Sequence, residues 1–151
     1  MTGLVSTFAA GQVASTETDS SDSQSIPSSR KDIQGVITLD TMSFDKSIRD
    51  GNIWLVEFYA NWCGHCKKFA HSYATLALDI HERTENIRIA KVDGDVERAI
   101  SSRFNIEGYP TFYLIDGWSV YVYKGHRQIH PMAEFVKGGY KDTEVRSLAC
   151  L

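Results

Sequence analysis

Two cysteines separated by two residues follow directly on an apolar segment, and this arrangement constrains the fold more than any other feature. Residues 53–59 (IWLVEFY) are apolar on both alternating faces except at Glu57, as in a central strand covered on both sides. Cys63 and Cys66 come next, at the expected start of a helix over residues 63–83. A buried strand that leads into such a helix is typical of a redox-active dithiol.

The position of each cysteine predicts its role. Cys63 would lie at the helix N-terminus, where unpaired backbone N–H groups and the helix dipole favour a negative charge. Its thiolate is the form that attacks a substrate disulfide. Cys66 lies one turn later, close enough to attack the resulting mixed disulfide and release the substrate. We therefore predict that Cys63 is the nucleophile and Cys66 the resolving thiol.

A zinc site is the alternative use of paired cysteines. Structural zinc needs four ligands, usually from a second cysteine pair or from two suitably spaced histidines. The remaining cysteine is Cys150, near the end of the sequence, and His65 lies between the two thiols, where it cannot easily share a metal with both. The sequence therefore favours a dithiol over a metal site.

Composition predicts one globular domain flanked by two short segments. The 151 residues are 42% hydrophobic and 11% aromatic, and a net charge of −3 gives no electrostatic reason to expect binding to nucleic acid or an anionic membrane. No apolar run approaches the length of a membrane span. Residues 16–30 are polar, so we expect residues 1–34 to be a disordered leader. Within it, residues 4–14 weakly resemble a signal sequence without a basic start.

Between residues 35 and 140 the hydrophobic pattern predicts a β-α-β-α-β-α-β-β-α order. This order belongs to the α/β class, with a mixed central sheet and helices on both faces. Asp116 and Gly117 form the expected turn of the hairpin. Residues 141–151 are predicted to be a short tail, in which Cys150 is a free thiol or pairs between chains. The expected strands and helices are residues 35–39, 41–50, 53–59, 63–83, 87–93, 96–104, 111–115, 120–123 and a final helix from about Pro131.

Five sequence blocks in this order resemble the thioredoxin-like catalytic domain of protein disulfide isomerases. The chain is also similar to the luminal domain of thioredoxin-related transmembrane members, without the membrane span that those carry. The resemblance implies a thioredoxin fold over residues 35–140. It also implies a thiol–disulfide oxidoreductase that needs no bound cofactor. The blocks are residues 56–60 (VEFYA), 62–67 (WCGHCK), 90–93 (AKVD), 108–111 (GYPT) and 123–127 (YKGHR).

The resemblance also implies roles for the residues between and behind the cysteines. Gly64 and His65 form the pair that in this family accompanies oxidase and isomerase activity, with His65 favouring the Cys63 thiolate. Glu57 would exchange protons with Cys66 as general base and acid, with Lys91 as its partner on the next strand. The alternatives are an exposed histidine without a role and a purely structural Glu57–Lys91 pair.

Four further residues match family positions around the dithiol. Most X-Pro bonds are trans, but the resemblance implies a cis Pro110 that packs against the dithiol, with the Tyr109 backbone presented to substrate polypeptide. Trp62 would offer an apolar face to unfolded substrates, or else pack in the core. Arg127 would lower the pKa of Cys66 when it approaches, or else lie in solvent.

Partners and compartment follow from the resemblance alone. The expected substrates are unfolded or misfolded polypeptides with cysteines in the endoplasmic reticulum lumen or the secretory pathway. Glutathione or another thiol oxidoreductase would recycle the dithiol. A chaperone-like binding module with secondary redox activity and a thioredoxin-type reductase remain alternatives. Asn61 and His71 replace family prolines, and without the second proline we expect a straighter active-site helix.

Overall fold

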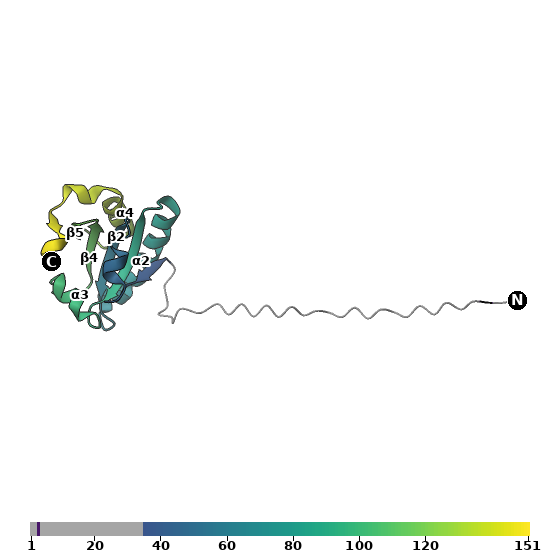
Figure 1. Ribbon diagram of the computed structural model, residues 1–151, viewed down its shortest axis with the longest axis horizontal. Coiled ribbons are helices and arrows are strands. Elements are labelled where there is room, and N and C mark those ends of the chain that lie inside the picture. Colours follow the sequence, from purple (N-terminus) through teal and green to yellow (C-terminus); the bar gives the residue numbers. More distant parts are fainter. Residues whose placement is uncertain (1–2, 4–34) are drawn as a thin grey trace.

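The computed structural model describes residue 3 and residues 35–151, so the predicted leader lies, apart from residue 3, outside the described residues. The first nine elements follow the predicted order (Figure 1). Three short elements then follow. In chain order the elements are β1 (Val36–Thr38), α1 (Phe44–Ser47), β2 (Ile53–Tyr59), α2 (Gly64–Arg83), β3 (Ile87–Asp93), α3 (Arg98–Arg103), β4 (Thr111–Asp116), β5 (Ser119–Tyr123), α4 (Ile129–Lys137), the 3-10 helix η1 (Gly139–Asp142), β6 (Val145–Ser147) and the 3-10 helix η2 (Leu148–Cys150).

The strands form one mixed sheet with β2 near its centre. The strand order is β1-β3-β2-β4-β5-β6. β3 runs parallel to both β1 and β2, whereas β2–β4, β4–β5 and β5–β6 are antiparallel. The predicted mixed sheet is therefore confirmed, and the predicted hairpin turns at Gly117, which has φ of 60°.

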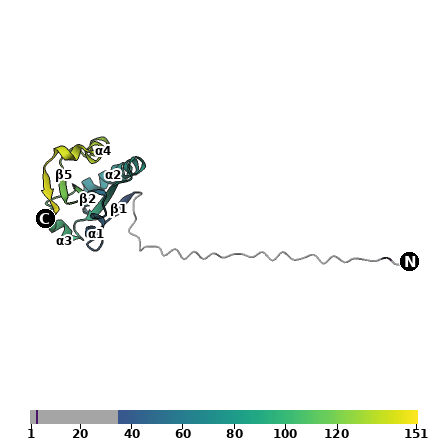
Figure 2. The same cartoon turned by 45° about the horizontal axis from the view of Figure 1, so that its top comes forward.

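Helices cover both faces of the sheet (Figure 2). Leu55 of β2 packs in a core with residues of α2 and α4. Its neighbours Val56 and Phe58 belong to a second core that includes residues of α1 and α3. Because β2 is covered on both sides, its sequence needs apolar residues at alternate positions on both faces.

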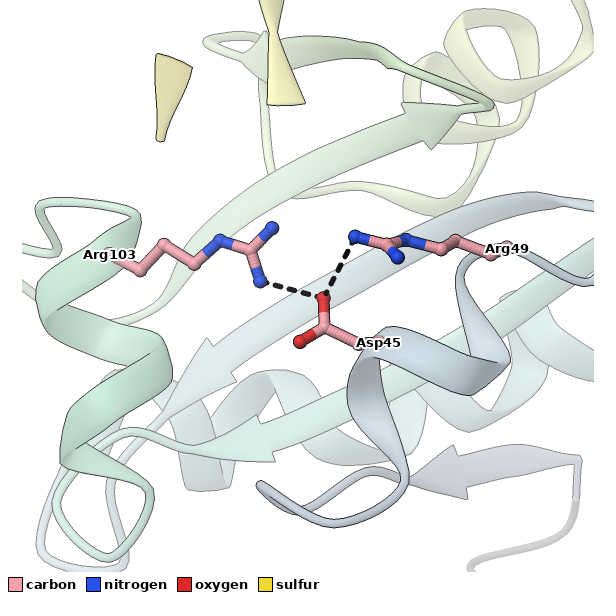
Figure 3. Close-up of polar contacts among 3 residues, drawn as sticks. All are labelled: Asp45, Arg49 and Arg103. Atoms are coloured by element: carbon pink, nitrogen blue, oxygen red, sulfur yellow. Dashed lines mark hydrogen bonds and ion pairs between the residues drawn. The ribbon is translucent and has the colours of Figure 1, made fainter. Parts of the chain in front are cut away.

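The first helix is shorter than predicted. The expected helix over residues 41–50 is limited to Phe44–Ser47. The Asp40 side chain accepts the backbone N–H groups of Met42 and Ser43, which holds this stretch in a turn. On the surface, Asp45 of α1 forms an ion pair with Arg103, the last residue of α3, at 2.7 Å. Asp45 also pairs with Arg49 at 3.9 Å (Figure 3). Exposed pairs of this kind add little stability.

The second helix begins one residue later than predicted, because Cys63 is its N-cap. Apolar residues at three- and four-residue steps along this segment predict one inward-facing stripe, and the prediction is confirmed, since all of its members are buried. The stripe consists of Cys66, Phe69, Tyr73, Leu76 and Ile80.

None of the helices in the part of the chain that the structure describes is long and apolar enough to cross a membrane.

The segment predicted as a tail adds a sixth strand to the sheet. β6 pairs antiparallel with β5, and the N–H of Leu148 donates to the carbonyl of Trp118 at 2.7 Å. The Leu148 side chain is 1% exposed and packs in the core beside α1 and α3. The sequence did not indicate this strand because all three of its residues are exposed, which leaves no alternating pattern.

Replacing Leu148 with alanine tests whether this segment belongs to the core. We expect Leu148→Ala to lower the free energy of unfolding by about 2–4 kcal/mol, because it removes buried methyl groups and leaves a cavity. Val145→Ala is the matched control on the same segment, since Val145 is 55% exposed. Urea unfolding followed by circular dichroism measures both. Equal, small effects would contradict the assignment of Leu148 to the core.

Candidate active site

The two cysteines form a disulfide at the N-terminus of α2. Their Cα atoms are 5.3 Å apart, and both side chains are buried. Cys63 has extended backbone angles, and its sulfur accepts the backbone N–H of Cys66 at 3.2 Å. The helix therefore directs a backbone N–H that has no carbonyl partner within the helix, and the positive end of its dipole, at the sulfur predicted to act as nucleophile.

A cis peptide bond lies beside this disulfide. The bond between Tyr109 and Pro110 is cis, which confirms the geometry expected from the resemblance. The carbonyl oxygen of Tyr109 lies 3.6 Å from the Cys63 sulfur, and Tyr109 packs against the buried cluster that contains the two cysteines and Ala60. Gly94 lies beneath the Tyr109 ring, where any Cβ atom would collide with it. The backbone of Tyr109 is thus fixed beside the dithiol.

Trp62 is a surface residue rather than a core residue. Its side chain is 68% exposed, and its ring meets Tyr109 edge-on with 5.9 Å between centroids. The indole N–H donates to the carboxylate of Asp95. Trp62 and Tyr109 therefore form an aromatic surface next to Cys63.

Glu57 is a buried carboxyl group without a hydrogen-bond partner at Oε1 among the described residues. Its side chain is 4% exposed. Burial raises the pKa of Glu57 to about 7, and the positive charge of Lys91 opposes this rise. Lys91 is opposite Glu57 in the β2–β3 register, with its Nζ 5.6 Å from the centre of the Tyr59 ring. The ion pairs of residues 35–151 do not include one between Glu57 and Lys91.

Glu57 and Cys66 line the same pocket, which has a volume of about 220 Å³. Glu57, Cys66, Lys91 and Tyr73 all line it. The Tyr73 hydroxyl donates to the carbonyls of β2 and β3 at 3.1 and 2.7 Å, so its proton is not directed at Glu57. Burial, and then the Glu57 charge, raise the pKa of Tyr73. The pocket gives the Glu57 carboxyl a route to the Cys66 side.

His65 and Arg127 lie on the other side of the helix start. Both are exposed and line a shallow pocket of about 270 Å³ with Lys68 and Phe69 of α2. The structure thus brings Arg127 from the loop after β5 to the first turns of α2. The hydrogen bonds of the described residues do not include one from His65 to Cys63. Gly64, the first residue of α2, is exposed with open space around it.

Sequence reasoning missed two residues of the site. Asp93, at the end of β3, is buried and accepts a hydrogen bond of 2.7 Å from the Asn61 side chain. Asp95 holds the Trp62 indole. A carboxylate at a strand end is a common turn residue, so its sequence context gave no signal of these contacts. In the described part of the chain, no group of three or more His, Cys, Asp or Glu side chains is arranged to hold a metal.

The model of the Thioredoxin family matches residues 35–138. The chain belongs to this family. The matched range contains the disulfide, the cis proline and Glu57, and it ends just after α4. The mixed sheet with helices on both faces is accordingly a thioredoxin fold, as predicted.

Relatives of this thioredoxin-family chain include protein disulfide isomerases. It is 38% identical over 107 residues to bovine (Bos taurus) protein disulfide-isomerase A4, a match that covers 71% of the chain and 17% of that protein. It is 40% identical over 104 residues to protein disulfide-isomerase erp38 of Neurospora crassa, covering 67% and 28%. The chain thus spans well under a third of either relative.

A solved single domain matches more completely. The first thioredoxin domain of mouse protein disulfide-isomerase A4 has a TM-score of 0.67 and 32% identity to this protein. The match covers 79% of this chain and 85% of that domain. The similarity is therefore one of whole thioredoxin domains, whereas the longer relatives contain much more chain.

The raised pKa of Glu57 predicts that the wild-type protein is destabilised at high pH. In the unfolded chain the pKa of Glu57 is near its ordinary value of 4.5, and in the folded protein it is about 7. Below pH 4.5 Glu57 is largely protonated in both states, so its ionisation does not change the free energy of unfolding there. As pH rises through this window, the free energy of unfolding falls by up to about 3 kcal/mol, the equivalent of this difference in pKa.

Glu57→Gln removes this titration. We expect the variant to be more stable than wild type by up to about 3 kcal/mol above pH 7 and to match it near pH 4. Urea unfolding at pH 4, 6 and 8 measures the difference. Glu134→Gln, on the exposed side of α4, is the control that should track wild type. A Glu57→Gln advantage that does not grow with pH would contradict the raised pKa.

Proposed function

We propose that this protein is a thiol–disulfide oxidoreductase of the protein disulfide isomerase type. The observation that carries the proposal is the Cys63–Cys66 disulfide at the N-terminus of α2, beside the cis Tyr109–Pro110 bond. The Cys63 thiolate attacks one sulfur of a substrate disulfide and displaces the other as a thiolate. Cys66 then attacks Cys63 in the mixed disulfide, which releases the second substrate thiol. Two electrons pass to the substrate, and the reverse sequence oxidises a substrate dithiol.

Glu57 manages the proton of the second step. Cys66 must lose its proton before it attacks, and Glu57 opens onto the same pocket. A carboxyl group with a pKa of about 7 is present in both forms near neutral pH. It can therefore take the Cys66 proton during release and return it when the disulfide is reduced. Lys91 keeps this pKa from rising further.

His65 and Arg127 act through charge. The His65 side chain, on the first turn of α2, favours the thiolate of Cys63 and so stabilises the reduced protein. Arg127 lines the adjoining shallow pocket, from which its guanidinium can approach Cys66 and lower the pKa of that thiol. Gly64 adds no side chain next to the cysteines, and the position of its missing Cβ atom is open.

The substrates are polypeptides that contain cysteines. The Tyr109 backbone, fixed beside Cys63, pairs with an extended substrate segment, and Pro110 sets the direction of this edge. The exposed Trp62 ring supplies apolar contact that an unfolded segment can use. Glutathione or another thiol oxidoreductase restores the dithiol or disulfide. By resemblance, this chemistry takes place in the endoplasmic reticulum lumen or the secretory pathway.

Cysteine variants test the proposed order of attack. We expect Cys63→Ala to abolish catalysed refolding of a reduced protein with native disulfides, because the attacking thiolate is gone. Cys66→Ala should instead accumulate a mixed disulfide with the substrate, visible on a non-reducing gel and removed by reductant. Cys150→Ala is the control, since Cys150 is an exposed free thiol outside the site. Trapping through Cys150, or activity in Cys63→Ala, would contradict the scheme.

The redox potential separates an isomerase from a thioredoxin-type reductase. Equilibration with glutathione buffers should give a potential near about −180 mV, because His65 stabilises the reduced dithiol. His65→Ala should move it towards about −270 mV, the thioredoxin value. His81→Ala, at the far end of α2, is the matched control with no expected shift. A wild-type potential near the thioredoxin value would assign the chain to the reductases.

A further inference from the structure

The turn that leads into the dithiol carries an asparagine at its second position. The N–H of Cys63 donates to the carbonyl of Ala60 at 3.1 Å and closes a turn over residues 60–63. The second position of such a turn favours proline, whose ring fixes φ near the required value. Here that position is Asn61, which has no ring. The turn therefore needs its constraint from elsewhere.

A buried carboxylate supplies a contact at this position. The Asn61 side-chain amide donates to Oδ2 of Asp93 at 2.7 Å, and Asp93 is 6% exposed. The other carboxylate oxygen accepts the backbone N–H groups of Asp95 and Val96 at 3.1 and 3.3 Å. One carboxylate thus holds both the turn before Cys63 and the turn after β3.

Two further contacts join the same turns. The N–H of Gly94 donates to the carbonyl of Tyr59 at 2.8 Å, and Asp95 accepts the Trp62 indole N–H. A side chain at position 94 would collide with the Tyr109 ring, so glycine is needed there. The stretch after β3 therefore contacts residues just before Cys63 and lies close to Tyr109.

We propose that Asn61 is a positioning residue, which through its hydrogen bond to Asp93 holds Cys63 at the helix N-terminus in place of a proline ring. The hydrogen bonds of the described residues do not join Asn61 to either sulfur. It acts by keeping the turn closed, so that the Cys63 sulfur faces the N–H of Cys66. A thiolate at Cys63 gains its stabilisation from that N–H and the helix dipole. This inference rests on the proposed role of Cys63 as the attacking thiolate.

The pH dependence of alkylation tests the proposal. In a reduced Cys150→Ala background, reaction with iodoacetamide reports the thiolate fraction of Cys63. We expect Asn61→Ala to raise the midpoint pH and to slow alkylation at pH 7 by about two- to fivefold, because the turn loses one hydrogen bond of ordinary strength. Asn61→Asp should have a larger effect, because two carboxylates then share the contact. Asn61→Pro should keep the wild-type alkylation profile, because the proline ring fixes φ at this position of the turn.

Tyr140→Phe is the matched structural control. It deletes a side-chain hydrogen bond of 3.0 Å to another carboxylate, Asp116. Asp116 pairs with Ile53 at the start of β2, whereas the dithiol follows the other end of that strand. We expect it to lower the melting temperature and leave the alkylation profile unchanged. An unchanged profile in Asn61→Ala, or an equal shift in Tyr140→Phe, overturns the proposal.

The two proposals fail in different ways. If wild-type Cys63 titrates as an ordinary thiol and refolding is not catalysed, the proposed function fails. If wild type is active and the midpoint pH of its Cys63 alkylation is low, but Asn61→Ala does not change that midpoint, only the proposed role of Asn61 fails. Circular dichroism of each variant identifies any that is unfolded. Should Asn61→Pro not fold, the comparison of wild type with Asn61→Ala and Asn61→Asp still decides.

Discussion

The active site depends on the burial of β2 on both faces of the sheet. Because α2 and α4 cover one face, and α1 and α3 the other, the strand runs through the interior and emerges only at its end. There the turn over residues 60–63 delivers Cys63 to the start of α2. The same burial removes water from Glu57, so one structural constraint positions the sulfur and tunes the carboxyl group behind it.

The site contains two buried carboxyl groups, Glu57 and Asp93, in different surroundings. Glu57 lacks a hydrogen bond at one oxygen, and Lys91 does not approach it closely enough to form an ion pair. A core would be more stable without such a group. In contrast, both carboxylate oxygens of Asp93 accept hydrogen bonds from the surrounding turns. Glu57 thus keeps one oxygen without a hydrogen bond, whereas both oxygens of Asp93 hold the backbone or the Asn61 side chain.

Much of this arrangement was predictable from local pattern and resemblance. The apolar residues 53–59 indicated a doubly covered strand, and the inward stripe of α2 was read correctly from its spacing. The cis bond before Pro110 came from the family resemblance, since a lone X-Pro pair favours trans. β6 was not predictable, because three exposed residues have no periodicity and pair only once β5 provides an edge.

By itself, the sequence determined the order of the elements, the dithiol and the helix that begins at it, because these depend on local spacing and polarity. The tertiary structure decided which distant groups meet. Asp93 lies 32 residues from Asn61, and Arg127 comes from another loop altogether. Contacts of this kind depend on how strands pair and helices cover them, and the pKa of Glu57 depends on the resulting burial, so neither is written in any local pattern.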